Sequence, residues 1–242
     1  MEDIIKKISN TLTLVIAFFV SAMFYFNYKG FVYEDGKIFL KPQEAKATEM
    51  NGIASVLPKD IALNVSYKFA EGSEKAPLTM YEFSSFGCPH CADFHLDTMP
   101  KLKRDFMDKG LLRVVFVNFP LDKQSMKVAM LSECMTYENY TSFVDNMFSE
   151  QRSWWQDTDN ERLFQYAAEY GLSYDEAQRC IGNDAVARDI VSLRQDAMTR
   201  LGIQGTPAFM ISGADGNEII YGARGYDEVK NYIESRLLRL QK

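Results

Sequence analysis

The chain has 242 residues, 47% of them apolar, and a formal net charge of −6 at pH 7. This length and apolar content predict one large folded domain, or one domain with an insert, and exclude a disordered chain. Acidic and basic residues are mixed along the sequence, without a run of Lys or Arg that could follow a phosphate backbone, so nucleic acid is not an expected partner.

The N-terminal segment 1–28 is predicted to direct the chain to a membrane. Residues 8–28 carry no charged side chain and are long enough to cross a bilayer's hydrocarbon core. Val20 and Ala22 follow a shorter apolar stretch at positions where a signal peptidase could cut. A cleaved signal peptide and a retained transmembrane anchor therefore both stay open, beside a buried core helix. Either membrane role predicts that the rest of the chain is exported.

Residues 29–59 form an N-terminal extension. Two short β-prone runs flank Asp35-Gly36, a pair that favours a tight hairpin turn. Residues 42–60 have two interpretations. They are a tether, or they are a short helix that joins copies into a homo-oligomer through one apolar face made of Ala47, Met50, Ala54 and Leu57.

The folded part is predicted to begin at residue 60. Apolar runs at 61–69, 78–83, 111–119, 208–212 and 218–223 indicate strands. A helix is predicted from Pro89, and Pro100 should kink or end it near Met99, before a second helical piece that reaches Asp108 and stops at Gly110. Apolar side chains recur at helical spacing through 122–202 and again near the C-terminus. The expected fold is α/β, with one domain at 60–121 and 203–242 and an all-helical insert at 122–202.

Two cysteines follow the second of these strands at the start of a helix. Cys88 and Cys91 are separated by Pro89 and His90. The free N–H groups and partial positive charge of a helix N-terminus favour a thiolate at Cys88, which makes it the attacking sulfur. Cys91 lies one turn on and can close a disulfide, while His90 adds a donor that favours the reduced form. A strand followed by C-x-x-C at a helix start is the arrangement of the thioredoxin fold.

Other chemistries fit the cysteine pair less well. A structural zinc site would have to crowd its four ligands, Cys88, His90, Cys91 and His95, onto one helix end. Haem attachment requires a His directly after the second cysteine, where this chain has Ala92. An inert structural disulfide remains as an alternative. The prediction is a redox-active disulfide with no metal and no other cofactor.

The wider motif resembles the DsbA family of bacterial extracytoplasmic thiol–disulfide oxidoreductases. "CPHC" at 88–91, Glu82 six residues before it, a helical insert, and "GTPAF" with Thr206-Pro207 carry the resemblance over residues 60–242. The resemblance implies a thioredoxin fold with a helical insert, a buried acid at Glu82 and a cis-proline loop at Pro207. It also implies exported protein substrates, a membrane redox partner that regenerates the enzyme, and a periplasmic location, soluble or anchored to the inner membrane.

Glu82 and Pro207 also have interpretations from physical chemistry. A carboxylate inside an apolar strand should have a raised pKa and could exchange a proton with Cys91, unless Glu82 faces solvent at the strand end. A cis Pro207 would leave the backbone of Thr206 open to an extended substrate, whereas an ordinary trans proline would have no such role.

The direction of the redox reaction stays open. Thr206 before the proline resembles disulfide isomerases and reductases as much as oxidases. The function predicted is therefore introduction or exchange of disulfides in exported proteins, with an oligomeric isomerase or reductase as the alternative. A non-catalytic binding or metal-carrier protein of the same fold is a third hypothesis.

The second cysteine pair lies in the helical insert. Cys134 and Cys180 both fall on apolar helix faces, so they can meet. A structural disulfide is predicted, and two buried free thiols or a second redox-active pair are the alternatives.

Overall fold

The computed structural model describes the backbone of residues 31–34, 37–40, 54–57, 69–157 and 159–241, and side chains from residue 69 onward. The chain divides into two compact units, 1–49 and 50–242. In the first, strands β1 (Phe31–Glu34) and β2 (Lys37–Leu40) pair antiparallel, as the hairpin prediction required. The predicted membrane segment 1–28 lies outside the described residues; within them, no helix has the length and apolar character to span a bilayer.

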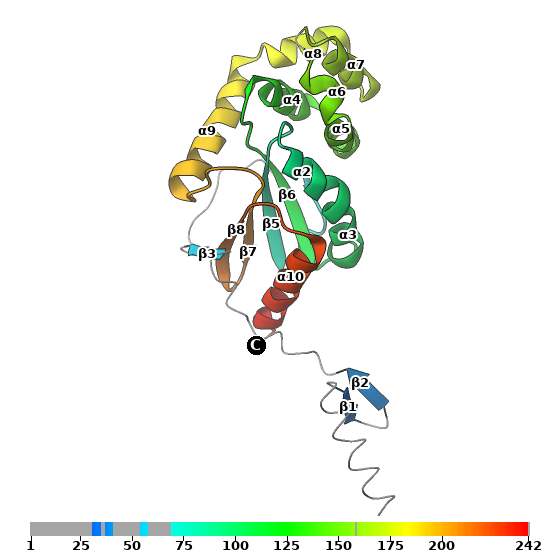
Figure 1. The fold of residues 1–242 in the computed structure, drawn as a ribbon, viewed down its shortest axis with the longest axis vertical. Helices are drawn as coiled ribbons and strands as arrows, with labels where there is room; N and C mark the ends of the chain where they lie inside the picture. Colours follow the sequence, from blue (N-terminus) through cyan, green and yellow to red (C-terminus); the bar gives the residue numbers. More distant parts are fainter. Residues whose placement is uncertain (1–30, 35–36, 41–53, 58–68, 158, 242) are drawn as a thin grey trace, which may run out of the picture. The chain divides into compact units, whose positions relative to one another are not determined.

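The second unit is built on a six-stranded sheet (Figure 1). The strands, in spatial order, are β3 (Ala54–Leu57), β8 (Gly216–Tyr221), β7 (Ala208–Gly213), β5 (Leu78–Ser84), β6 (Leu112–Asn118) and β4 (Ala70–Glu71). Strands β5 and β6 run parallel, and the other neighbouring pairs run antiparallel. The short strand β4 lies at the edge, so β6 has a partner on each side, as expected from its continuous apolar sequence.

One part of the N-terminal extension belongs to this sheet. One of the two interpretations of residues 42–60 placed Ala54 and Leu57 on one face of a helix, but they lie in strand β3, which pairs with β8. The helical seam is therefore wrong at these two positions, because backbone pairing with a sheet edge outweighs a short apolar repeat. The other two members of the proposed seam, Ala47 and Met50, lie outside the described residues, as does most of the strand expected at 61–69.

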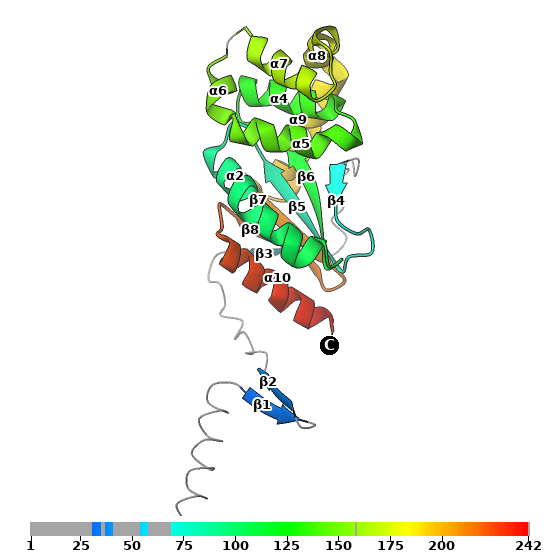
Figure 2. The ribbon, with the colours of Figure 1, turned by 90° about the vertical axis from the view of Figure 1, so that its right-hand side faces the viewer.

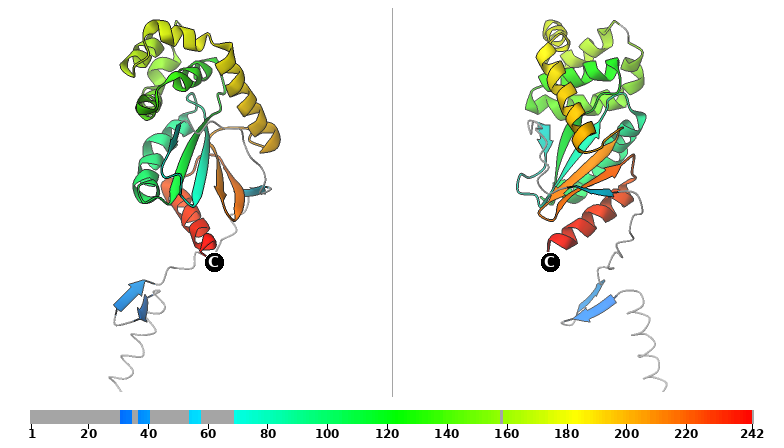
Figure 3. Two further views of the ribbon diagram at one scale, coloured as in Figure 1. Left: turned by 180° about the vertical axis from the view of Figure 1, so that it is seen from behind. Right: turned by 90° about the vertical axis from the view of Figure 1, so that its left-hand side faces the viewer.

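Strand β5 presents a different core on each face, because side chains alternate along a strand. Leu78 and Met80 pack with the helix that follows β5 and with α10 (Tyr226–Leu240). Tyr81 and Phe83 pack on the other face, against the C-terminal part of α9 (Asp184–Arg200). Figures 2 and 3 show these helices on the two faces of the sheet.

The helix after β5 continues past Pro100 to Met107, close to the end at Asp108 predicted for its second piece. Its segments are α2 (Pro89–Asp93), the π-helical η2 (Phe94–Thr98), α3 (Met99–Leu102) and the π-helical η3 (Lys103–Met107). Pro100 does not end the helix at Met99. It lies in the first turn of α3, directly after the wider π turn, where its missing N–H and its ring are more easily accommodated.

The helical insert lies beyond the end of the sheet where β5 and β6 finish (Figures 1 and 2). Its other helices are α4 (Lys123–Cys134), α5 (Tyr137–Ser149), α6 (Gln151–Trp155), α7 (Glu161–Glu169) and α8 (Tyr174–Ile181). Ser173 and Glu176 form the capping box that their spacing indicates. Cys134 and Cys180 form a disulfide with a Cα–Cα distance of 6.4 Å, which links the end of α4 to α8.

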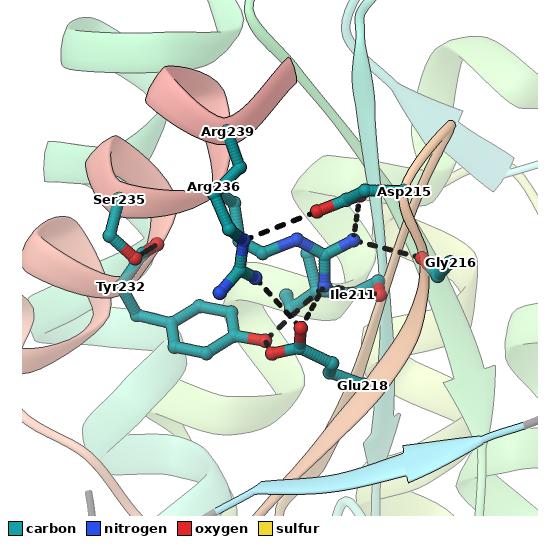
Figure 4. A network of polar contacts seen from close by, with 8 residues as sticks. All are labelled: Ile211, Asp215, Gly216, Glu218, Tyr232, Ser235, Arg236 and Arg239. Atoms are coloured by element: carbon teal, nitrogen blue, oxygen red, sulfur yellow. Dashed lines mark hydrogen bonds and ion pairs between the residues drawn. The ribbon is translucent and has the colours of Figure 1, made fainter. Parts of the chain in front are cut away.

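Helix α10 is joined to the β7–β8 hairpin by a polar network around Arg236 (Figure 4). The Arg236 side chain is fully buried and lies 2.5 Å from Asp215 and 3.5 Å from Glu218. It also donates to the carbonyl oxygen of Gly216 at 2.8 Å. Arg239, which is 45% exposed, binds the same two carboxylates from the next helical turn. The network holds one buried cation between two acids and fixes the C-terminal helix to the sheet.

Candidate active site

The two cysteines of the C-x-x-C sequence lie at the first turn of α2. Cys88 is the N-cap residue, and Pro89 follows at the first helical position. The N–H of Cys88 donates to the carbonyl oxygen of Ser85 at 3.0 Å, and the N–H of Cys91 donates to the carbonyl oxygen of Cys88 at 3.1 Å. Both thiols are free and buried. The strand–turn–helix predicted from the sequence is confirmed, with Cys88 Sγ at a helix N-terminus.

Cys88 is held as the nucleophile. The pKa of its thiol is lowered to about 5, first by a hydrogen bond from the Cys91 thiol and then by the hydroxyl of Thr206 and the backbone N–H groups of Cys91 and His90. Burial of the sulfur opposes these effects. At neutral pH, Cys88 is therefore a thiolate.

Cys91 has the opposite character. It has no exposed surface, and burial raises its pKa far above that of a free thiol, with the adjacent Cys88 adding to the effect. The hydroxyls of Ser84 and Thr206 act in the other direction. The pair is thus divided into one thiolate and one thiol, and Cys91 can leave or attack only if a proton moves with it.

The Thr206-Pro207 loop lies against the cysteines. Its peptide bond is cis, so the alternative of a trans loop proline is wrong. Cys88 Sγ lies 3.5 Å from the carbonyl oxygen of Thr206. The residues that follow Pro207 enter β7, which pairs with β5. This topology brings Thr206 and the cysteines together although 118 residues separate Thr206 from Cys88.

Glu82 is buried within strand β5, so its alternative position in solvent is wrong. It has no exposed surface and points to the same face of β5 as Met80, which packs with Phe94 of η2. Burial raises its pKa to about 7, against smaller lowering effects of His95 and Ser84. A carboxyl group with this pKa can hold or release a proton under physiological conditions.

His90 contributes through its backbone. Its side chain is 71% exposed, with Nδ1 3.9 Å from Asp93 Oδ2, and its N–H helps to lower the pKa of Cys88. The His95 side chain, in η2, is paired with Asp145 of α5, with Nε2 2.6 Å from the carboxylate. Among the described residues, no group of three or more His, Cys, Asp or Glu side chains could hold a metal ion.

The comparisons with known proteins agree with this geometry. A family model described as thioredoxin matches residues 65–235, more than half of the chain. The structure of alpha-DsbA1 from Wolbachia pipientis is 30% identical, with a TM-score of 0.64, and the match covers 71% of this chain and 92% of that one. The chain belongs to the DsbA family. The resemblance stated from the sequence is thus confirmed, together with the thioredoxin fold and its helical insert.

Two curated relatives place this DsbA-family chain among disulfide enzymes. Disulfide bond formation protein D of Bacillus subtilis is 29% identical, and the match covers 69% of this chain and 75% of that protein. A protein of Rickettsia conorii, named as a protein-disulfide oxidoreductase, is 26% identical over 63% of this chain. The chain spans 57% of the length of the Rickettsia protein.

Several residues around the DsbA-like motif were missed by the sequence analysis. Gln151 of α6 donates from Nε2 to the carbonyl oxygens of Phe86 at 2.6 Å and of Cys88 at 3.1 Å, which fixes the loop before α2. Trp155 of the same helix covers Gly87 so closely that a Cβ there would lie 2.1 Å from the indole ring. Neither contact has a sequence signal, because α6 and the cysteines are far apart in the chain.

A third missed residue is Ser84, two positions after Glu82 on the same face of β5. Its hydroxyl lowers the pKa of both Glu82 and Cys91, so it lies close to each of them. The sequence alone does not mark this serine, because its closeness to Glu82 and Cys91 depends on which face of β5 its side chain occupies.

Proposed function

We propose that this protein is an exported thiol–disulfide oxidoreductase that introduces disulfides into protein substrates through Cys88 and Cys91. The observation that carries the proposal is the division of the pair into an acidic Cys88 and a buried, protonated Cys91 beside the Thr206-Pro207 loop. The names of the relatives support the same activity.

The oxidation of a substrate proceeds in two exchanges. A substrate thiolate attacks Cys88 Sγ of the Cys88–Cys91 disulfide, and the Cys91 sulfur leaves with the electron pair and takes up one proton. A second substrate thiolate then attacks the substrate sulfur of the mixed disulfide. Cys88 leaves as a thiolate, so the substrate is oxidised to a disulfide and the enzyme is reduced to a dithiol. Glu82 supplies the proton that Cys91 takes up.

The acidity of Cys88 favours this direction over reduction. A thiol of low pKa is a good leaving group, and stabilising its thiolate stabilises the reduced enzyme, which makes the disulfide more oxidising. The backbone of Thr206 next to Cys88 Sγ is placed to pair with an extended segment of the substrate. His90, with its ring in solvent, is proposed to tune the thiolate from the outer side.

The location and partners follow from the same activity. Residues 8–28 are proposed to act as a signal peptide or inner-membrane anchor, with the folded part in the periplasm and a membrane redox partner that reoxidises the dithiol. The Cys134–Cys180 disulfide supports an oxidising compartment, because a reducing cytosol rarely allows such a bond to persist. We assign that disulfide a structural role.

The test uses two versions of the protein, residues 29–242 and residues 50–242, because the second keeps strand β3. Each is oxidised and mixed with a reduced, unfolded protein, and in parallel with a scrambled-disulfide protein. We expect both versions to oxidise the reduced substrate at equal rates, and Cys88→Ala to abolish the reaction. Recovery of the scrambled substrate by the longer version alone would instead support an oligomeric isomerase, and no exchange by either version would contradict the proposal.

A further inference from the structure

A cavity of about 180 Å³ lies where the helical insert meets the sheet. Residues of β4 and β6, of α5, and of the helix after β5 line it, so both parts of the fold contribute. Cys88, Cys91, Thr206 and Pro207 are not among the lining residues. Pockets for small molecules occur preferentially at junctions between parts of a fold. The cavity is therefore a candidate binding site separate from the cysteines.

The cavity is lined mainly by apolar side chains, and its size limits what it can hold. The apolar lining residues include Phe69, Met99, Met107, Val114, Phe116 and Val144. An apolar cavity of ~150 Å³ in another protein holds benzene, so this one has room for a six-membered ring and a few further atoms. Drug-sized ligands use pockets of ~300 Å³ or more. Phenylalanine rings and methionine sulfurs both make favourable contacts with an aromatic ring.

Two polar atoms of the lining residues are buried without a hydrogen-bond partner among the described residues. They are Nδ1 of His95 and the hydroxyl oxygen of Tyr140. His95 is only 8% exposed and Tyr140 only 5% exposed. Since buried polar groups in folded proteins nearly always have a partner, these two atoms call for an explanation. A ligand in the cavity would supply both missing partners.

The chemistry of these two atoms defines the polar group of such a ligand. Nε2 of His95 lies 2.6 Å from Asp145 Oδ1, and a carboxylate can only accept, so Nε2 carries a hydrogen and Nδ1 of the neutral ring is an acceptor. Burial raises the pKa of Tyr140 well above its usual value, so its side chain stays a neutral hydroxyl that can donate. A hydroxyl group on the ligand can donate to the first atom and accept from the second.

The charged side chains at the cavity already have partners. Lys103 Nζ lies 3.0 Å from Glu71 Oε2, and the hydroxyl of Thr141 donates to the other oxygen of Glu71 at 2.5 Å. Asp145 is bonded to His95. A charged ligand would lose its hydration in an apolar cavity and would find no free counter-charge among these residues. The cavity therefore favours a neutral ligand.

The backbone around the cavity is also unusual. His95 lies in the π-helical segment η2, and Lys103 and Met107 lie in the second π-helical segment η3. π-Helical turns are rare and are frequently found at functional sites. Two of them contribute residues to this one cavity, which supports a role in binding.

We propose that this cavity binds a small neutral phenol, with the aromatic ring among the apolar side chains and the hydroxyl group paired with His95 Nδ1 and Tyr140. A bound phenol would touch α5 of the insert and β6 of the sheet at once, so it would stabilise the junction between them. The inference does not depend on the direction of disulfide exchange.

The test titrates the full chain, oxidised at Cys88 and Cys91 and labelled with ¹⁵N, with phenol, toluene or anisole, and follows the amide signals by NMR. Toluene has the shape of phenol without the hydroxyl, and anisole can accept a hydrogen bond but cannot donate one. A site that pairs with a ligand hydroxyl rejects analogues that leave its polar groups unpaired, so phenol should bind tighter than either analogue by about tenfold or more. The largest shifts should fall on lining residues such as Phe116 and Val144.

A matched pair of variants tests the polar contact. Tyr140→Phe should weaken phenol binding by about five- to tenfold, the ordinary value of one hydrogen bond, and should not weaken toluene binding. Because this change removes an unpaired buried hydroxyl, the variant should melt at or above the wild-type temperature. Tyr137→Phe, at an exposed tyrosine of the same helix, is the control and should bind phenol as wild type does.

Several results would overturn the proposal. One is the absence of shifts at the lining residues in a large excess of phenol, and another is shifts centred on Cys88, which would place phenol at the substrate site. Equal binding of toluene and phenol would show that the polar atoms do not select the ligand. Tighter binding of N-acetyltyrosine amide than of phenol would assign the cavity to a tyrosine of a protein partner. Each of these results leaves the proposed oxidoreductase function intact.

Discussion

The Cys134–Cys180 disulfide offers a prediction whose size can be worked out from the structure. The bond closes a ring over a sequence separation of 46 residues, from the end of α4 to α8. A disulfide that closes a loop of this length reduces the conformational entropy of the unfolded chain, which adds about 4 kcal/mol to the free energy of unfolding in the chain-entropy model. For a domain of about 200 residues, that corresponds to a melting temperature about 10 °C higher.

The assay requires that only one disulfide can form. We would use a background of Cys88→Ala and Cys91→Ala, and compare thermal unfolding with and without dithiothreitol. The reductant should lower the melting temperature by about 10 °C in this background, consistent with the ring size. Adding Cys134→Ala and Cys180→Ala should lower it by a similar amount and make it insensitive to the reductant.

A melting temperature that stays the same when the Cys134–Cys180 disulfide is reduced would contradict its structural role, because the bond would then add no stability. In the protein with Cys88 and Cys91 intact, loss of the second pair should leave the rate of substrate oxidation per folded molecule unchanged. A large change in that rate would instead support the redox-active interpretation of Cys134 and Cys180.

Three further predictions concern the surroundings of the site. Arg236→Leu should lower the free energy of unfolding, measured by urea titration, by about 3 kcal/mol, because it leaves two acids without their buried partner. The same change at the exposed Arg239 should lower it by less than about 1 kcal/mol. Equal losses would contradict the network. Gly87→Ala should lower stability by about 1–3 kcal/mol through collision with Trp155, and Trp155→Ala should restore part of the loss, which melting curves can check. The pKa of Cys88 is lowered from 9.0 to about 5, so the reduced protein should gain stability relative to the oxidised protein as pH rises from 5 to 9, and lose that gain as pH falls. A difference in melting temperature between the reduced and oxidised proteins that does not change with pH would refute this.

The sequence predicted the parts of the site that lie close together in the chain. The strand before Cys88, the proline at the first helical turn and the acid at Glu82 all follow from local patterns, and the structure has them as predicted. The DsbA resemblance supplied Thr206-Pro207, which no local pattern connects to the cysteines.

The misses have physical reasons. Strand β3 forms because it can pair with the edge of β8. Its residue Ala54 pairs with Ile220, which lies 166 residues further along the chain, so no local sequence pattern indicates the pairing. Pro100 was expected to kink or end the first helical piece near Met99, but the π turn directly before it, which lets the helix continue, has no signal in the sequence. Gln151 reaches the loop of Cys88 only through the packing of the helical insert.

The measurement that tests the account most directly is the pKa of Cys88 in the reduced protein. Thiolate absorbance followed from pH 3 to pH 10, with Cys88→Ala as the blank, reports this group because Cys91 remains protonated. The account predicts a midpoint near pH 5, so that Cys88 is a leaving group and nucleophile under physiological conditions. A midpoint near a free thiol's ~8.5 would contradict the oxidising mechanism and favour a protein that uses the fold for binding alone.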